Sequence, residues 1–206
     1  MRKYIYILTL LVATLSVNSV QAQSLDDLIK SFTNLMSGTP ESTEQKHKVT
    51  YPEIYELIGR WNFDSLVVDY TGDNTLASVA VSTLEGQLPL LASKFDLVAG
   101  RDYVNIGEDG VITFVSGESR VSAHCNSYNS YNGEVTLTLY LTGKYINVTG
   151  VIFELNGKMR VLFDAKKVME LLAQNYTKFS ENTTLQMAKT VIDNYPGIRV
   201  GIAIKK

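Results

Sequence analysis

Cysteine is nearly absent from this chain of 206 residues, in which Cys125 is the single example. One thiol cannot form an intrachain disulfide, and with only two histidines it makes a poor set of zinc ligands. The fold must therefore depend on its hydrophobic core, which a content of 45% apolar residues can supply. We expect no metal site and no cofactor.

The chain also lacks an excess of charge of one sign. It has 19 basic and 21 acidic residues, for a formal net charge of −2. Without a basic field it has no electrostatic means of holding nucleic acid, so we exclude nucleic acid as a partner. Phosphate-binding glycine loops are missing as well, because Gly107–Gly110 and Gly143 fall in predicted hairpin turns rather than between a strand and a helix.

Long apolar runs are absent except near the N-terminus. Arg2 and Lys3 precede an apolar run over 5–17 that is short for a membrane span, and 20–22 has the residues of a cleavage site. We predict a signal peptide over 1–22, cut after Ala22, and an exported protein, periplasmic or secreted, with no integral membrane segment after cleavage. No cysteine follows the run, which excludes a lipoprotein anchor there. An uncleaved anchor is the alternative.

Residues 23–53 predict an N-terminal element of their own. Ser24 suits an N-cap, and apolar residues then recur at helical spacing over Leu25–Met36. The polar stretch Thr39–Lys48 predicts a linker. Residues 54–206 are then expected to form one domain.

Most of that domain predicts β-strands joined by tight turns. Asn156-Gly157 is the strongest hairpin signal, and Gly150 predicts a bulge or bend inside a strand. The predicted strands cover 57–70, 103–106, 111–115, 121–125, 135–141, 145–155, 159–163 and 198–205.

Helices are predicted at two places between these strands. After the first strand, apolar residues at helical spacing predict an insert over 76–98, divided near Gly86 and Pro89. Before the last strand, Asp164 suits the N-cap of a helix, and a second helix ends at Pro196.

This order of elements predicts a mainly β fold, an up-and-down antiparallel barrel of about eight strands with added helices. Such a barrel closes by pairing its terminal strands, here 198–205 with the strand that carries Trp61. A two-sheet sandwich fits less well, because it usually needs longer crossovers than this chain of hairpins contains.

Two segments carry a family resemblance. Leu57–Trp61 (LIGRW) and the C-terminal Asp193–Lys206 resemble a lipocalin-like family of exported gut-bacterial proteins of unknown function. The resemblance implies a barrel, with Gly59 and Trp61 as a structural plug of its closed end. The added helices depart from the ordinary lipocalin plan and could fill the cavity.

No residue set predicts catalysis. His124 and Cys125 are neighbours on a strand and point to opposite faces, and the other imidazole, His47, lies in the predicted linker. Asp64 and Asp69 are expected to face opposite sides of the first strand, and no separation of a carboxylate pair can be inferred, so nothing in the sequence supports acid–base catalysis. We assign no catalytic residue, and an enzyme stays open as the third alternative.

Two groups of residues predict ligand binding. Exposed tyrosine rings can stack on a sugar or an apolar ligand at a barrel mouth, or merely cover strand surfaces; the candidates are Tyr128, Tyr131, Tyr140 and Tyr145. An alternating apolar stripe is expected to line an open interior, namely Val135, Leu137, Leu139 and Leu141. We therefore predict an exported, non-catalytic protein that binds a small apolar or glycan-like ligand in or at the mouth of the barrel. The alternative is a structural or interaction protein of the cell envelope, with a filled barrel and a surface for a protein partner.

Overall fold

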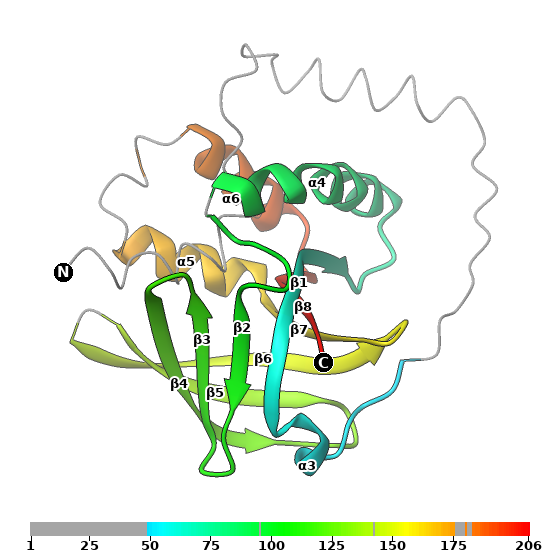
Figure 1. Ribbon diagram of the computed structural model, residues 1–206. Coiled ribbons are helices and arrows are strands. Elements are labelled where there is room, and N and C mark those ends of the chain that lie inside the picture. Colours follow the sequence, from blue (N-terminus) through cyan, green and yellow to red (C-terminus); the bar gives the residue numbers. More distant parts are fainter. Residues whose placement is uncertain (1–48, 95, 142, 176–179, 181–182) are drawn as a thin grey trace.

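The computed structural model describes residues 49–94, 96–141, 143–175, 180 and 183–206 (Figure 1). The predicted signal peptide, the predicted helix Leu25–Met36 and His47 lie outside these residues. Eight antiparallel strands form a closed barrel in chain order, as the sequence predicted. They are β1 (Gly59–Tyr70), β2 (Tyr103–Ile106), β3 (Val111–Ser116), β4 (Ser119–Tyr128), β5 (Glu134–Leu141), β6 (Lys144–Leu155), β7 (Lys158–Asp164) and β8 (Ile198–Lys205).

The barrel closes where β8 pairs with β1, from Asn62 opposite Lys205 to Tyr70 opposite Ile198. This pairing confirms the predicted closure. On its other edge, β1 pairs with β2 only from Gly59 to Asn62. Beyond that point helix α4 (Thr75–Lys94) packs beside β1 in place of a longer β2.

A bulge in β1 sets which side chains point inward. Trp61 and Phe63 are buried two residues apart, but the next buried side chain is Leu66, three residues on. The register shifts between Phe63 and Ser65, which places an extra residue on β1 at this point. Asp64 occupies the bulge.

Helix α4 differs from the predicted insert, because it runs unbroken through Gly86 and Pro89. Proline lacks the N–H that donates a hydrogen bond in a regular helix, and it usually ends or bends the helix for that reason. Leu88 is nevertheless buried in the main hydrophobic core, and this packing stabilises the helix across the proline.

Gly150 does not form a bulge, and the pairing of β6 with β5 and β7 is regular at this residue. A Cβ atom there would lie 2.5 Å from the Leu162 carbonyl oxygen and 2.7 Å from the Phe163 ring. Glycine is therefore required for the close approach of β7. The predicted Asn156-Gly157 turn is confirmed, with φ of 55° and 73° at the two residues.

One end of the barrel carries three helices (Figure 1): α4, α5 (Ala165–Asn175) and α6 (Thr183–Asn194). Asp164 caps α5 as predicted, since its Oδ1 accepts the Lys167 amide N–H at 2.8 Å. Val168, Met169 and Leu171 of α5 join the same core cluster as the inward side chains of the barrel. The helices thus fill this end with apolar side chains. None of the described helices has the length and apolarity to cross a membrane.

The opposite end carries the short helix α3 (Ile54–Leu57; Figure 1). The indole of Trp61 lies against the last residue of this helix. Trp61 is 8% exposed, its Nε1 donates to the Leu57 carbonyl at 2.7 Å, and the Lys206 ammonium lies 4.7 Å from its ring centroid. Gly59 opens β1 with φ of 115°, which strongly favours glycine.

Replacing this indole tests the prediction that Trp61 is a structural plug at this end of the barrel. We expect Trp61→Ala to lower the free energy of unfolding by about 3–5 kcal/mol, because it removes a buried aromatic ring and its hydrogen bond. Urea denaturation measures the change. Tyr131→Ala is the matched control: this aromatic ring is 91% exposed, so its removal should change stability by less than about 0.5 kcal/mol. Equal, small effects of both substitutions would contradict a structural role for Trp61.

Candidate functional site

The main candidate site is a pocket of about 620 Å³ beside the barrel. Its lining comes from α4, the connection over 96–99, consecutive residues of β1, and Arg160 of β7. The pocket therefore lies at the flank where α4 takes the place of a longer β2.

The short β2 explains why a pocket forms here. The Phe63 amide N–H donates to the Asp102 carbonyl at 2.7 Å, and the Gly100 N–H donates to the Phe63 carbonyl at 2.9 Å. These bonds hold the end of the α4–β2 connection against β1 near the bulge. From there on a helix lies beside the strand, and a helix cannot follow the strand surface as closely as another strand does.

The pocket wall is mainly apolar, with a few charged groups. Its apolar surface includes Leu66, Val67, Leu88, Pro89, Ala92 and Leu97. Glu85 and Arg160 contribute opposite charges. Burial raises the pKa of Glu85, while the positive charge of Arg160 lowers it and the negative charge of Asp69 raises it further.

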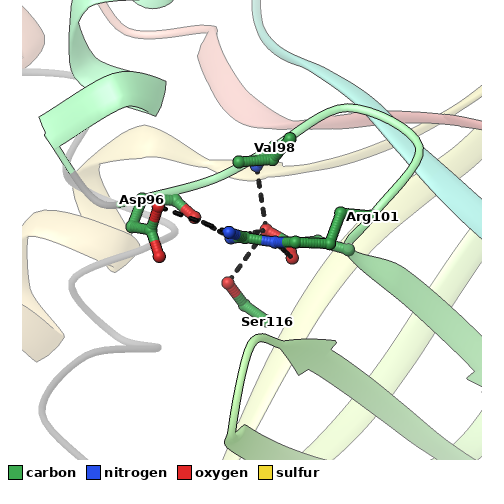
Figure 2. Close-up of polar contacts among 5 residues, drawn as sticks. Asp96, Val98, Arg101 and Ser116 are labelled. Atoms are coloured by element: carbon green, nitrogen blue, oxygen red, sulfur yellow. Dashed lines mark hydrogen bonds and ion pairs between the residues drawn. The ribbon is translucent and has the colours of Figure 1, made fainter.

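A buried carboxylate holds the connection that forms one wall (Figure 2). Asp102 is fully buried. It accepts hydrogen bonds from Arg101 Nε at 2.7 Å, the Val98 amide N–H at 2.9 Å and the Ser116 hydroxyl at 2.9 Å. Burial alone would raise the pKa of Asp102, but these hydrogen bonds, with that of Arg101 the strongest, bring it below its usual value.

Arg101 stabilises the connection over 96–102 through hydrogen bonds to Asp96 and Asp102. Its guanidinium donates to the backbone carbonyl of Asp96 and lies 3.4 Å from the Asp96 carboxylate. The hydrogen bond to Asp102 is the main cause of the raised pKa of Arg101. Because the pair joins both ends of the turn over 96–102, it fixes the position of the pocket wall.

Asp64 forms a second charged group at the pocket. Its carboxylate lies 2.6 Å from Lys158 Nζ and 2.8 Å from Lys205 Nζ. These bonds, first that of Lys158, lower the pKa of Asp64. Both lysines are on outward positions of their strands, so Asp64, which contacts them, also faces outward. Asp69 is on an outward position of β1 as well. The prediction that Asp64 and Asp69 face opposite sides was therefore wrong. The bulge is the reason, since it shifts the alternation between them.

The predicted apolar stripe of β5 lies on the inward face. Val135 and Leu137 are buried at 1% and 6% exposure, and Leu139 is half-buried against the same core. The side chain of Leu141 lies outside the described part of the molecule. Val135 and Leu137 therefore serve the packed interior, and they do not line the pocket beside α4.

The four predicted tyrosines do not form one cluster. Tyr140 and Tyr145 face each other across the β5–β6 hairpin, with ring centroids 5.1 Å apart, and both are exposed. Tyr131 lies in the β4–β5 turn. Tyr128 packs against the core instead, and its hydroxyl donates to the Pro52 carbonyl at 2.7 Å; burial raises its pKa to about 12.

His124 and Cys125 lie on opposite faces of β4. His124 is exposed, whereas Cys125 packs against the core, where burial raises the pKa of its thiol. The thiol is therefore not activated as a nucleophile. Within the described ranges, no group of three or more His, Cys, Asp or Glu side chains could hold a metal ion.

Glu85, Arg160 and Asp102 could not be recognised as site residues from the sequence. Glu85 and Arg160 are far apart in the chain, and only the packing of α4 beside the barrel brings them to one pocket. Asp102 follows Arg101 directly, and nothing in that dipeptide signals a fully buried carboxylate.

Comparison with known proteins gives one match. A model of the lipocalin-like domain family (DUF4923) matches residues 41–206. No curated protein and no solved structure matches this chain.

The Asp102 cluster predicts a pH-dependent stability. Because its folded pKa lies below the usual 3.8, ionised Asp102 stabilises the fold above that pH, and the contribution is lost as the pH falls through the folded pKa. We expect Asp102→Asn to lower the unfolding free energy by about 2 kcal/mol at pH 7. Denaturation from pH 7 to pH 2 should show this difference shrinking in acid.

Asp96→Asn is the control for this prediction. It removes the other carboxylate beside Arg101, but Asp96 is exposed, and we expect a change of less than about 1 kcal/mol. A difference between wild type and Asp102→Asn that stays constant down to pH 2 would contradict the role given to the ionised carboxylate. Asp64 is present in both the wild type and Asp102→Asn, so its titration cancels when their unfolding free energies are subtracted.

Proposed function

Because this chain belongs to the lipocalin-like domain family, we propose that it is an exported, non-catalytic protein that binds one small, mostly apolar molecule. The observation that carries the proposal is the pocket of about 620 Å³ between α4 and β1. The ligand lies at the flank of the barrel rather than at its centre.

The size and lining of the pocket support a small ligand. Pockets for small molecules typically measure roughly 300–1,000 Å³ and combine apolar walls with a few polar groups that orient the ligand. Here α4 and β1 supply the apolar walls, and the charged groups are those of Glu85, Arg160, Asp64 and Asp96. A molecule with an apolar body and a few hydrogen-bonding groups fits this arrangement.

The packing of the interior supports a site outside the barrel centre. Phe163 and Val200 are each at most 5% exposed, and they belong to one core cluster with Met169 of α5. A ligand at this position would have to displace close-packed side chains, which is unfavourable. The pocket beside α4 needs no such displacement.

Filling the pocket tests this proposal. We expect the neutral apolar dye N-phenyl-1-naphthylamine to bind with a rise in fluorescence, and Ala92→Trp to weaken its binding by about tenfold or more, because the indole occupies the space of the dye. Val67→Trp, on the opposite wall, should act in the same way. Fluorescence titration measures both.

The matched control is Ser82→Trp, which places the same indole on an exposed position of α4 outside the pocket. It should leave dye binding unchanged. Absence of dye binding by the wild type, or equal binding by all the variants with the folds intact by circular dichroism, would contradict the proposal.

Export is the second part of the proposal, and it depends on the sequence over 1–22. If the signal peptide is cut as its residues indicate, the mature chain begins at Gln23. Intact-mass spectrometry of protein expressed in a Gram-negative host should find this chain in the periplasm or the medium. A chain that keeps residues 1–22 in the membrane fraction would contradict it.

The alternative function, an envelope protein that binds a protein partner, is favoured by a different observation. Around the closed end the side chains of Val49, Tyr51, Ile54 and Tyr55 are 39–69% exposed. Exposed apolar side chains in neighbouring positions often mark protein interfaces. Crosslinking in the native host should then capture a reproducible partner through Tyr55, and capture of none would speak against this alternative.

A further inference from the structure

The outward face of β4, β5 and β6 is covered by neutral polar side chains. Register places Thr138 between His124 on β4 and Asn147 on β6, and places Thr136 opposite Thr149. Tyr140 and Tyr145 form the next outward pair. We call this surface the Thr–Asn face; it comprises Asn126, Thr136, Thr138, Tyr140, Tyr145, Asn147 and Thr149.

Hydrogen bonds hold part of the Thr–Asn face in a fixed arrangement. Asn126 Nδ2 donates to the Thr138 hydroxyl at 2.6 Å, and that hydroxyl donates to Asn147 Oδ1 at 2.6 Å. An asparagine amide carries two N–H donors. These two bonds use one donor of Asn126 and none of Asn147, so donors at fixed positions remain for a ligand.

The two tyrosines add aromatic surface at the end of this face. Tyr140 is 57% exposed and Tyr145 is 79% exposed, and their rings lie at 51° to each other. An isolated exposed tyrosine is ordinary on a strand. Two adjacent ones beside a row of hydroxyl and amide groups offer both stacking and hydrogen bonding.

Asp, Glu, Lys and Arg side chains are absent from the positions that make up the Thr–Asn face, and the exposed imidazole of His124 adjoins it beside Thr138. The nearest charged residues on outward positions of β4 and β5 are Arg120 and Glu134, at the ends of the two strands away from its centre. A surface for nucleic acid or an acidic polymer would need cations. A surface for an apolar protein partner would need a core of apolar side chains.

We propose that the Thr–Asn face binds a neutral oligosaccharide chain. The uncharged polar row matches the hydroxyl groups of such a chain, and the aromatic pair matches the apolar face of a sugar ring. The face is open and extended over three strands, which suits several linked sugar units rather than one. The proposal goes beyond the pocket function, because it concerns another surface and another class of ligand.

Affinity electrophoresis tests the proposal. The protein is run in native gels that contain galactomannan, xyloglucan or amylopectin, and in gels with no polysaccharide or with anionic polygalacturonate. We expect retardation in at least one neutral gel. The double variant Tyr140→Ala/Tyr145→Ala should bind about tenfold more weakly, because both stacking rings are lost.

Three variants serve as controls. Tyr140→Phe/Tyr145→Phe keeps the rings and should keep the retardation. Tyr131→Ala removes a tyrosine that is 91% exposed but lies outside the Thr–Asn face, and it should bind as the wild type does. Ala92→Trp fills the pocket beside α4 and should also leave retardation unchanged, so that failure of the pocket proposal and failure of this one are distinguishable.

Four results would overturn the proposal. These are no retardation in any neutral gel, retardation in polygalacturonate alone, equal retardation of the double alanine variant, and loss of retardation in Tyr131→Ala. Circular dichroism verifies that each variant is folded, and the exposed positions of Tyr140 and Tyr145 favour this.

Discussion

The pairing of β8 with β1 determines how the barrel closes and where the added helices pack. It joins the two ends of the domain, closes the barrel and commits one edge of β1 along most of its length. The other edge is paired with β2 only from Gly59 to Asn62. Helix α4 then covers the part of the β1 edge that β2 does not reach, and the pocket forms between α4 and β1. The position of the pocket thus follows from the way in which the barrel closes.

Closure and the added helices together explain why the proposed ligand site lies at the flank rather than at the centre. Inside the barrel, α5 contributes Val168, Met169 and Leu171 to the core, so the end that an open barrel would leave free is packed. At the flank, Asp102 and Arg101 fix the 96–102 connection through a buried carboxylate that is fully hydrogen-bonded. Such a carboxylate is stable only with these partners, so the wall has one preferred position.

Much of the fold could be predicted from the sequence because its signals are local. Alternation over Ile198–Lys205, the Asn156-Gly157 turn and the Asp164 cap each depend on neighbouring residues, and the structure confirms them. Other features depend on contacts between distant segments, namely the unbroken α4, the bulge at Asp64 and the close approach of β7 to Gly150. The bulge was not predicted, and the predictions for α4 and Gly150 were wrong for that reason. The pocket was hard to predict because its residues come from distant segments of the chain. The pairing of Tyr140 with Tyr145 could be predicted, since the short turn at Gly143 places these two residues opposite each other.

Locating a bound probe by its contacts to single side chains shows whether the ligand lies beside the barrel, as we propose. With methyl-labelled protein, intermolecular nuclear Overhauser effects from bound N-phenyl-1-naphthylamine report which side chains it contacts. We expect contacts to the methyl groups of Leu88 and Leu97 in the pocket wall. Contacts to Val135 and Leu137 instead would place the probe inside the barrel, and the proposed site beside α4 would be wrong.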